Sequence, residues 1–395
     1  MKKTEIIEKA EANLLHTYNR FPVVLDRGEG VYLYDCDGKQ YLDFAAGIAV
    51  FALGYHNPDF DNAVKAQADK LVHTSNLFYN EPAAETAEKL NRLTGMDRVF
   101  FTNSGTEAIE GAIKLARKYA YNKDGCTDHE IIAMNHSFHG RSMGALSVTG
   151  KAAYQDPFKP LIGGVKFAEY NDLDSVKDLV TDKTCAVILE TFQGEGGIYP
   201  AEEGFLKGLR RICDEKDILL IFDEIQCGMG RTGKMFCYQH YGVEPDVLTV
   251  AKALGNGLPV GAFLCKEFAA ALVPGDHGTT YGGNPLVCAA AGKVLDLFEE
   301  RKLPEHAKEV GEYLYQQLEG LKERHSCIKD HRGMGLLQGL EFVESTPVGE
   351  VCSKAQDQGL IVISASGNVL RFVPPLIVEK EHVDEMIRKL ENCLD

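Results

Sequence analysis

One lysine, Lys252, lies between an apolar segment and a glycine-rich turn, in the run Asp246-Val-Leu-Thr-Val-Ala-Lys-Ala-Leu-Gly-Asn-Gly257. A second apolar segment, Ile218-Leu-Leu-Ile-Phe-Asp223, ends in a carboxylate. In parallel sheets, functional side chains characteristically lie at the carboxyl ends of the strands. The two segments are therefore candidates for bringing the amine of Lys252 and the carboxylate of Asp223 to one site.

A lysine and an aspartate placed in this way favour pyridoxal 5'-phosphate chemistry. The lysine can hold the cofactor aldehyde as a Schiff base, and the aspartate can keep the pyridine nitrogen protonated, so that the ring accepts electrons. The linkage also matters because a free lysine amine, with a reference pKa of about 10.4, is mostly protonated near neutral pH. Taken singly, Lys252 could be a solvated loop lysine and Asp223 a helix cap.

Two further segments could hold the phosphate and the ring. Ser104-Gly-Thr-Glu-Ala108 follows an apolar segment and opens a helical pattern, so its free N–H groups and the helix dipole could bind a phosphate. The same turn is also an ordinary helix N-cap. Asn135-His-Ser-Phe138-His-Gly-Arg141 follows the next apolar segment and offers an aromatic face for a ring and a guanidinium for a carboxylate. Loops of this type also occur without such roles.

One glycine-rich run resembles two other nucleotide-binding motifs. Gly228-Met-Gly-Arg-Thr-Gly233 fits the dinucleotide fingerprint GxGxxG, and its extension to Lys234 fits the GxxxxGK of a P-loop. The fingerprint must follow its strand directly, but residues 223–227 intervene, and a P-loop needs Ser or Thr where this chain has Met235. An NAD oxidoreductase or a P-loop NTPase is therefore disfavoured. A non-catalytic binding module would not need all these elements together.

The composition limits the classes of partner. The 395 residues carry 42 Lys and Arg against 58 Asp and Glu, a net charge of −16, which would repel nucleic acid and anionic membranes. The basic start has no apolar core typical of a signal peptide, and the longest apolar stretch, residues 44–53, is too short to span a bilayer. Eleven cysteines without a CxxC pair indicate reduced thiols in the cytoplasm, and the scattered histidines give no support for a metal site.

The elements that must position these residues follow an α/β pattern. From residue 58 to about 290, apolar segments alternate with helical patterns, which predicts a mainly parallel sheet covered by helices. The predicted strands are residues 99–101, 131–134, 186–189, 219–222, 247–250 and 260–264. A short amphipathic helix and two strands, residues 31–34 and 40–44, come before them. We predict an N-terminal arm or part of a small domain over residues 1–57, a large domain over 58–300 and a small α+β domain over 301–395.

Taken together, residues 15–395 closely resemble the class III, ornithine-type aminotransferases of fold type I. The run Leu220-Ile-Phe-Asp-Glu-Ile-Gln-Cys-Gly-Met-Gly-Arg-Thr-Gly233, followed by Val250-Ala-Lys-Ala-Leu-Gly255, matches the signature of that family almost letter for letter. The resemblance implies a seven-stranded, mainly parallel sheet, a smaller α+β domain, pyridoxal 5'-phosphate as cofactor and a homodimer. One departure is Thr191, which stands where the family usually has proline.

The resemblance also implies roles for the cofactor-binding residues. Lys252 would carry the cofactor and shuttle a proton, and Asp223 would pair with the ring nitrogen. The remaining implied contacts are Gln226 with the ring hydroxyl, Ser104, Gly105 and Thr106 with the phosphate, Phe138 stacked on the ring, and Thr280 with the phosphate of the neighbouring subunit.

The same resemblance implies a ping-pong reaction between a terminal-amine donor, with N2-acetylornithine the best match, and 2-oxoglutarate. Arg141 would bind the distal carboxylate of either substrate, and Arg371 the α-carboxylate of glutamate. A terminal-amine donor would leave Arg371 unpaired, and an uncompensated buried charge costs roughly 3–5 kcal/mol. Glu195 could cover Arg371 and swing aside for glutamate. Tyr18 and Thr279 would also lie beside substrate.

The identity of the donor stays open at this point. Ile48 stands where ornithine-specific members carry a substrate-contacting tyrosine, which argues against free ornithine. Succinylornithine, succinyl-diaminopimelate and 4-aminobutyrate all share a terminal amine with a distal carboxylate, so they remain alternatives. Assignment to arginine biosynthesis would follow from the donor and not from any residue pattern.

Overall fold

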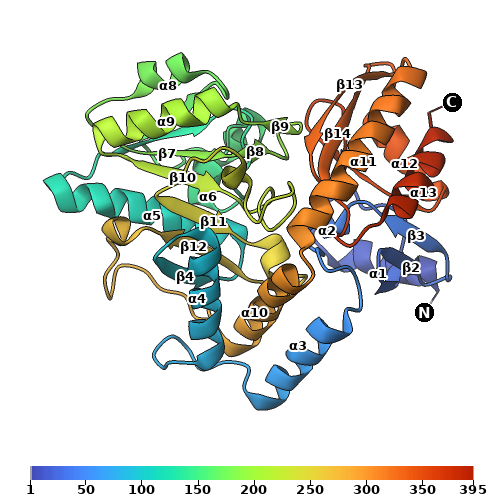
Figure 1. The fold of residues 1–395 in the computed structure, drawn as a ribbon, viewed down its shortest axis with the longest axis horizontal. Coiled ribbons are helices and arrows are strands. Elements are labelled where there is room, and N and C mark those ends of the chain that lie inside the picture. The colour runs from blue at the N-terminus through green and yellow to red at the C-terminus, as the bar shows by residue number, and fades with distance from the viewer. Residues whose placement is uncertain (1, 395) are drawn as a thin grey trace.

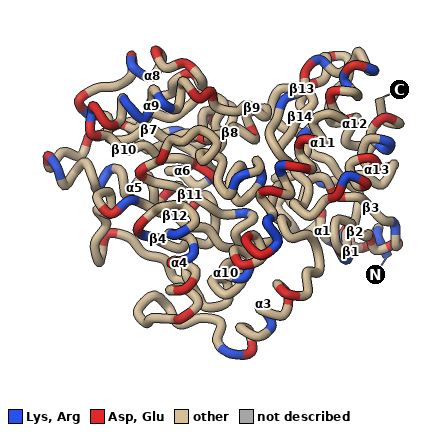
Figure 2. Tube along the Cα trace, viewed as in Figure 1, with Lys and Arg blue, Asp and Glu red and all other residues tan. Residues whose placement is uncertain are grey.

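The computed structural model describes residues 2–394, which form a larger body and a smaller body side by side (Figure 1). The smaller body contains both ends of the described chain. Figure 2 shows basic and acidic residues interspersed along the trace of both bodies. None of the helices in residues 2–394 has the length and apolar character needed to cross a membrane.

A seven-stranded sheet forms the centre of the larger body, as predicted. Its order is β4 (Arg98–Thr102), β12 (Gly261–Cys265), β11 (Val247–Val250), β10 (Leu219–Asp223), β7 (Thr184–Glu190), β5 (Glu130–Met134) and β6 (Val165–Ala168). The pairs from β11 to β6 are parallel, and β12 is antiparallel to both of its neighbours. Every residue of β7 and β10 is buried, because helices cover both faces of the sheet.

All six predicted strands are present, but β6 was missed. This strand, Val-Lys-Phe-Ala, lies at the edge of the sheet, and three of its four residues are only partly buried. It therefore lacks the continuous apolar run by which the central strands were recognised.

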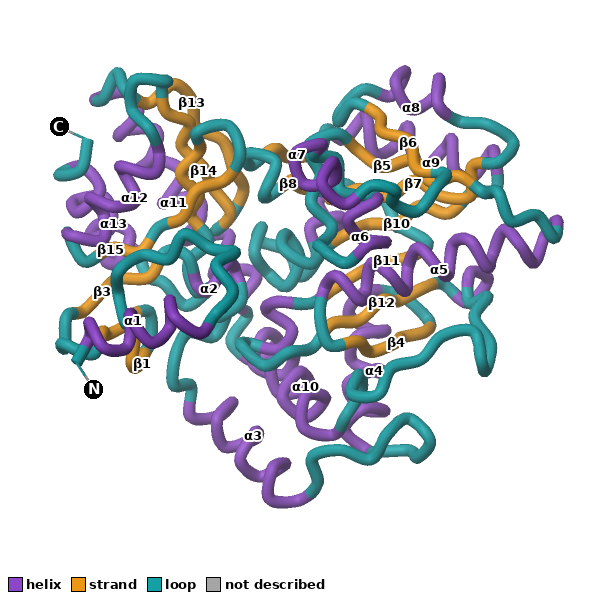
Figure 3. Tube along the Cα trace, turned by 180° about the vertical axis from the view of Figure 1, so that it is seen from behind, coloured by secondary structure: helices purple, strands orange, loops and turns teal. Residues whose placement is uncertain are grey.

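Helices cover this sheet and extend below it (Figures 1 and 3). The longest, α5 (Gly105–Asp124), begins where the Ser104 hydroxyl accepts a hydrogen bond from the N–H of Glu107 and ends at Gly125 in the left-handed conformation. The other helices of the larger body are α3 (Pro58–Lys70), α4 (Glu81–Thr94), α6 (Met143–Ser147), α7 (Ala152–Gln155), α8 (Leu173–Leu179), α9 (Glu203–Lys216) and α10 (Pro285–Glu300). Short 3-10 turns span Asp156–Phe158, Cys237–His240, Lys252–Gly255 and Glu267–Ala269, and β8 (Phe192–Gln193) pairs with β9 (Tyr199–Pro200).

The smaller body joins the two ends of the chain. Strands β1 (Leu25–Glu29), β2 (Tyr32–Asp35) and β3 (Gln40–Asp43) form a sheet with β15 (Leu360–Ile361), which pairs parallel to β3. A second sheet has the order β13 (Ile328–Met334), β14 (Leu337–Phe342), β17 (Val369–Phe372), β16 (Ile363–Ala365). Its helices are α11 (Leu303–Arg324), α12 (Val348–Asp357) and α13 (Lys380–Glu391), and α1 (Lys3–Asn13) lies near the N-terminus. The proposed domain boundaries at residues 57 and 300 stay predictions.

The turn α2 (Ala46–Ala49) departs from an ordinary helix. All four of its residues have positive φ, including Ile48 at 68°. A left-handed turn costs roughly 1–2 kcal/mol per non-glycine residue, most clearly for a β-branched one. The strained turn directly precedes Val50, which lines the cavity described next.

Candidate active site

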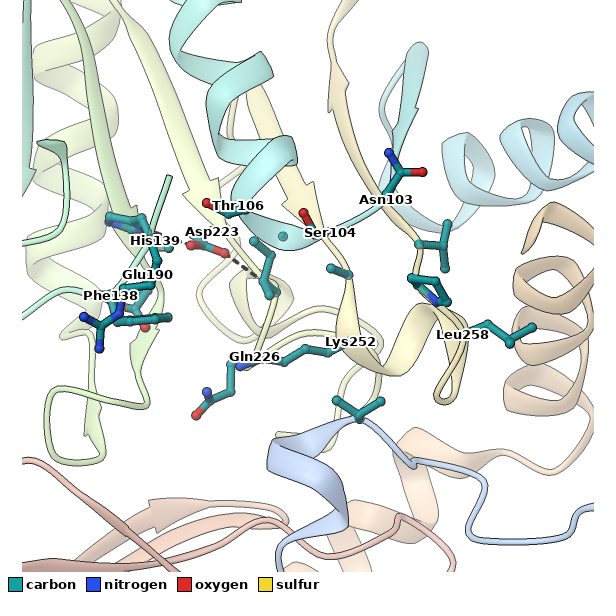
Figure 4. A pocket seen from close by; sticks show the side chains of 18 of the residues that line it. Asn103, Ser104, Thr106, Phe138, His139, Glu190, Asp223, Gln226, Lys252 and Leu258 are labelled. Atoms are coloured by element: carbon teal, nitrogen blue, oxygen red, sulfur yellow. Dashed lines mark hydrogen bonds and ion pairs between the residues drawn. The ribbon is translucent and has the colours of Figure 1, made fainter. Parts of the chain in front are cut away.

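A cavity of about 470 Å³ opens at the carboxyl ends of β10 and β11. Eight of the predicted site residues line it: Ser104, Gly105, Thr106, Phe138, Arg141, Asp223, Gln226 and Lys252. Figure 4 shows that the labelled side chains among them, such as those of Thr106, Phe138 and Lys252, come from different elements. The parallel strands therefore bring together residues that lie up to about 150 positions apart in the chain.

Lys252 follows β11 directly and starts a 3-10 turn with a positive φ of 47°. The pKa of its amine is lowered from 10.5 to about 8, chiefly by burial and also by the charge of Arg371, although Glu195 and Asp223 oppose this shift. Near neutral pH a larger fraction of the amine is therefore unprotonated than in an exposed lysine. Such an amine is suited to attack a carbonyl group.

Asp223 ends β10 and is buried against a histidine. Its Oδ2 lies 2.7 Å from Nδ1 of His139, and its Oδ1 accepts hydrogen bonds from the N–H of Ile225 and the hydroxyl of Thr249. Burial alone would lower the pKa of His139, but its bond to the Asp223 carboxylate raises that pKa above its usual value. His139 lies in the segment 135–141, but the sequence alone predicted no role for it. No rule of sequence spacing links this histidine to Asp223.

The first turn of α5 forms one end of the cavity. The Thr106 hydroxyl lies 2.7 Å from the hydroxyl of Ser142, and a Cβ on Gly105 would come within 2.9 Å of Ile225 Cδ1. The first N–H groups of a helix have no partner within it, and the helix dipole favours an anion there. A glycine at this position leaves those groups open to a phosphate.

These groups fit pyridoxal 5'-phosphate. An amine, a carboxylate, a helix N-terminus and the aromatic face of Phe138 surround one cavity, which is the donor set that this cofactor requires. The Nε2 atom of His139 is also buried without a hydrogen-bond partner among residues 2–394, so the cavity wall carries unused polar capacity. The individual cofactor contacts stay predictions.

A second cluster lies behind Gln226. The Nη1 atom of Arg371 donates to Glu195 Oε1 at 2.6 Å and to Gln226 Oε1 at 3.0 Å. Burial alone would raise the pKa of Glu195, but Arg371 and Lys252 lower it below its usual value. The structure therefore brings together the arginine and glutamate that were predicted to act as a pair, although neither lines the main cavity.

Three further predicted residues lie outside the cavity lining, in addition to Arg371 and Glu195. The Thr279 hydroxyl accepts a hydrogen bond of 3.3 Å from Asn103, which does line it, so Thr279 lies next to the rim. Thr280 and Tyr18 are exposed, and Tyr18 is 71% accessible to solvent. The roles predicted for these residues stay predictions.

One buried acid in the cavity wall was missed. Glu190 ends β7, and its carboxylate accepts a hydrogen bond of 3.0 Å from the N–H of Phe138. Burial raises the pKa of Glu190 to about 7; nearby Asp223 raises it as well, and His139 opposes the shift. The signal that identified Asp223, a carboxylate ending an apolar strand, applies equally to Glu190.

The unusual Thr191 also has a structural role. Its hydroxyl donates a hydrogen bond of 2.6 Å to the buried carboxylate of Glu224, which also accepts from the N–H groups of Cys237 and Tyr238. A proline at this position could not donate that bond. Glu224, Cys227 and Cys237 have ligand atoms within 4.8 Å of one another, but the two oxygens of Glu224 are already engaged by these donors.

Comparisons with known proteins agree with this geometry. The chain matches the family described as Aminotransferase class-III over residues 15–394, which confirms the resemblance found in the sequence. It is 50% identical to the acetylornithine aminotransferase of Methanocaldococcus jannaschii over 379 residues, or 96% of this chain and 95% of the relative. It is also 50% identical to the acetylornithine aminotransferase of Clostridium acetobutylicum, over 98% of this chain and 100% of the relative.

Solved structures of the same kind have closely similar folds. The ornithine aminotransferase of Toxoplasma gondii superposes with a TM-score of 0.96 at 31% identity, over 100% of this chain and 95% of that one. The acetylornithine aminotransferase of Elizabethkingia anophelis superposes with a TM-score of 0.89 at 34% identity, over 100% and 99%. Another structure of the Toxoplasma enzyme is described as having partial occupancy of the cofactor at its active site.

Proposed function

This chain belongs to the class III aminotransferases, which depend on pyridoxal 5'-phosphate, and we propose that it is an acetylornithine aminotransferase. It would transfer the terminal amine of N2-acetyl-L-ornithine to 2-oxoglutarate, giving N-acetyl-L-glutamate 5-semialdehyde and L-glutamate in arginine biosynthesis. The observation that carries this proposal is the 50% sequence identity, over nearly the whole chain, to relatives named acetylornithine aminotransferase. We further propose that the protein works in the cytoplasm.

When bound, the cofactor supplies an electron sink for the carbon that carries the reacting amine. Lys252 would hold its aldehyde and move a proton through the same amine. Asp223, oriented by His139 at 2.7 Å, would hold a proton on the ring nitrogen. The N–H groups of Gly105 and Thr106 would bind the phosphate, and Phe138 would cover one ring face.

The two arginines would divide the substrate carboxylates between them. Arg141 lines the cavity and would bind the carboxylate far from the reacting carbon. Arg371 would bind the α-carboxylate of glutamate, which lies next to the reacting carbon. Acetylornithine has no carboxylate next to its reacting carbon. The observed ion pair between Arg371 and Glu195 is the arrangement that an acetylornithine complex would need.

The active unit would be a homodimer. Thr280 is exposed and does not line the cavity of its own chain, so it is available to the phosphate site of a second copy. The neighbouring loops also expose large apolar side chains, including Leu77, Phe78 and Tyr281. An exposed apolar surface of this kind favours association.

Half-reactions of the holoenzyme test the proposed donor. The purified protein is mixed with N2-acetylornithine, N2-succinylornithine, N-succinyl-diaminopimelate, ornithine and 4-aminobutyrate in turn, and the absorbance change of the bound cofactor is followed. We expect kcat/KM for acetylornithine to exceed the values for ornithine and 4-aminobutyrate by at least about tenfold, which corresponds to a difference of 1.4 kcal/mol in transition-state binding. A higher value for either of those two would reject the assignment.

The role of Lys252 has a separate test. Reduction of the holoenzyme with borohydride should attach the cofactor to Lys252, where peptide mass spectrometry can locate it. Lys252→Ala should lose the adduct, while the surface control Lys216→Ala should keep it. Attachment of the cofactor to any other lysine would reject the role given to Lys252.

A further inference from the structure

The guanidinium of Arg141 lies over an aromatic ring that also contacts a second cation. Arg141 Cζ is 3.6 Å from the ring centroid of Tyr154, and Lys151 Nζ is 4.4 Å from the same centroid. Lys151 Nζ also donates to the Tyr154 hydroxyl at 3.2 Å. Two positive charges therefore share one ring, and one of them, Arg141, lines the cavity.

Neither cation is neutralised by an acid. Among residues 2–394, no carboxylate oxygen lies within 4.0 Å of Arg141 or Lys151, whereas Arg371 is paired with Glu195 at 2.6 Å. Like charges so close together repel, and their separation cannot exceed the sum of their distances to the ring centroid. An anion bound between or beside them would relieve this repulsion.

The ring also determines how Arg141 can bind that anion. A guanidinium directly over a ring has its flat face covered, while its N–H edge stays free for in-plane hydrogen bonds to a carboxylate. Tyr154 is held in turn, because its N–H donates to the carbonyl of Lys151 at 2.9 Å and its ring meets Phe138 edge-on at 6.5 Å. Tyr154 thus links the orientation of Arg141 to the aromatic wall of the cavity.

Lys151 is also held by a contact with the smaller body. Its Nζ donates to the Ser366 hydroxyl at 3.0 Å, and the N–H of Ser366 donates to the carbonyl of Glu195 at 3.1 Å. Lys151 therefore lies between the Arg141 subsite and the loop that carries Glu195. These contacts hold its charge beside the Tyr154 ring and the Ser366 hydroxyl instead of letting it extend freely into solvent.

We propose that Tyr154 is a positioning residue for Arg141 and that Lys151 is a specificity-determining residue, a second cation that favours donors with two anionic groups at the end far from the reacting amine. This inference rests on the proposed function and deepens it. N2-acetylornithine has one carboxylate at that end, and N2-succinylornithine has two. The subsite accepts the first through Arg141 and gains a second ion pair with the other.

The positioning role is tested by Tyr154→Leu and Tyr154→Phe in the holoenzyme. Loss of the ring should raise KM for both acetylornithine and glutamate about fivefold, since both substrates use Arg141, and should leave kcat within about twofold. The phenylalanine variant keeps the ring face and should retain the KM of the wild type. Unchanged KM in Tyr154→Leu, or loss of kcat alone, would overturn this role.

A binding measurement accompanies the kinetics. Glutarate, a non-reacting dicarboxylate, should bind the Tyr154→Leu holoenzyme about fivefold more weakly than the wild type in calorimetry. If Tyr154→Leu does not fold, Tyr154→Met removes the same ring and is judged by the same values. Equal glutarate affinity in the wild type and the folded variant would contradict the proposal.

The role of Lys151 is tested by Lys151→Met, with the exposed Lys216→Met as the matched control. The ratio of kcat/KM for succinylornithine to that for acetylornithine should fall about fivefold in Lys151→Met, because a partly exposed ion pair contributes up to about this factor, and should not change in the control. An unchanged ratio in Lys151→Met would overturn the role of Lys151. A wild type that uses neither donor would reject the proposed function instead, and the glutarate affinities would still decide the role of Tyr154.

Discussion

Buried Arg371 and partly buried Glu195 form an ion pair of 2.6 Å beside the cavity, and the same arginine nitrogen donates to Gln226 at 3.0 Å. Arg371 is only 2% exposed, so water cannot compensate its charge when the pair opens. A terminal-amine donor brings no carboxylate to this position, whereas glutamate does. We therefore propose that opening and closing of this pair lets one site accept both substrates.

Glu195→Gln should separate the two half-reactions. The variant cannot neutralise Arg371, so the acetylornithine half-reaction should slow at least tenfold, while the glutamate half-reaction is retained or improved. Arg371→Lys should do the reverse, since a compact ammonium lacks the planar fork that a carboxylate prefers. Single-turnover rates for both substrates in both variants check this. Equal losses for the two substrates in each variant would reject the switch.

The parts of this site that the sequence predicted are those that follow strand ends. Asp223 and Lys252 were found because apolar strands lead to them, and Arg141 because it follows a strand within a short motif. Contacts between distant elements could not be found in this way. The bond from His139 to Asp223 and the position of Arg141 over the Tyr154 ring depend on how loops pack, and sequence spacing does not encode that packing.

The left-handed turn at Ile48 illustrates another limit. An isoleucine strongly disfavours positive φ. Nothing in the local sequence would therefore predict that the four consecutive residues 46–49 all have positive φ. Asp43 holds the start of this turn by accepting hydrogen bonds from the N–H groups of Ala45 and Ala46. Tertiary contacts of this kind override local preference, and the strain they maintain lies beside the cavity.

Asp223→Asn should keep the fold and bind the cofactor but lose most of the transamination rate. An amide cannot hold a proton on the ring nitrogen, and it would also weaken the 2.7 Å contact to His139. Electrostatic contributions of this type amount to roughly 3–4 kcal/mol, or a factor of about 100 to 1,000 in kcat. Cofactor content from absorbance, together with kcat, checks this expectation. Near wild-type turnover would reject the role of Asp223.

Glu190 should make the cofactor-free protein less stable as the pH rises. Its pKa is raised by burial from 4.5 to about 7, so its contribution to stability is complete below pH 4.5 and is lost as the pH rises through 7. The loss should amount to a few kcal/mol. The raised pKa of Glu224 also lowers stability as the pH rises, but Glu224 is present in both the wild type and the variant described next. Lys252, with a pKa of about 8, changes the stability mainly above this pH range.

Urea unfolding of wild type and Glu190→Gln at intervals between pH 5 and 7.5 measures this contribution. The free energy of unfolding should fall with pH less steeply in the variant, even if the variant is less stable at pH 5. The slope isolates the titration of Glu190 from the lost hydrogen bond to the N–H of Phe138. Parallel curves for the two proteins would show that Glu190 is ionised in the folded protein throughout this range.

Thr280 should act on the cofactor of a second copy, and this can be separated from dimerisation itself. The loops around residues 73–79 and 279–284 are joined by hydrogen bonds from Asn76 to the carbonyls of Thr279 and Gly282, and they expose Leu77 and Phe78. Introducing Asp at both Leu77 and Phe78 should give monomers in light scattering and weaken cofactor binding, because charges on a covered apolar surface oppose association.

The contribution of Thr280 itself is tested in a variant that keeps this surface intact. Thr280→Val should stay dimeric but bind the cofactor at least about tenfold more weakly through loss of one hydrogen bond to a charged group, while the exposed control Thr127→Val should not. Mixing Thr280→Val with Lys252→Ala gives heterodimers in which the intact Lys252 site receives Thr280 from its partner. Those sites should recover wild-type cofactor affinity if Thr280 acts across the interface, and they should stay weak if Thr280 acts within its own chain.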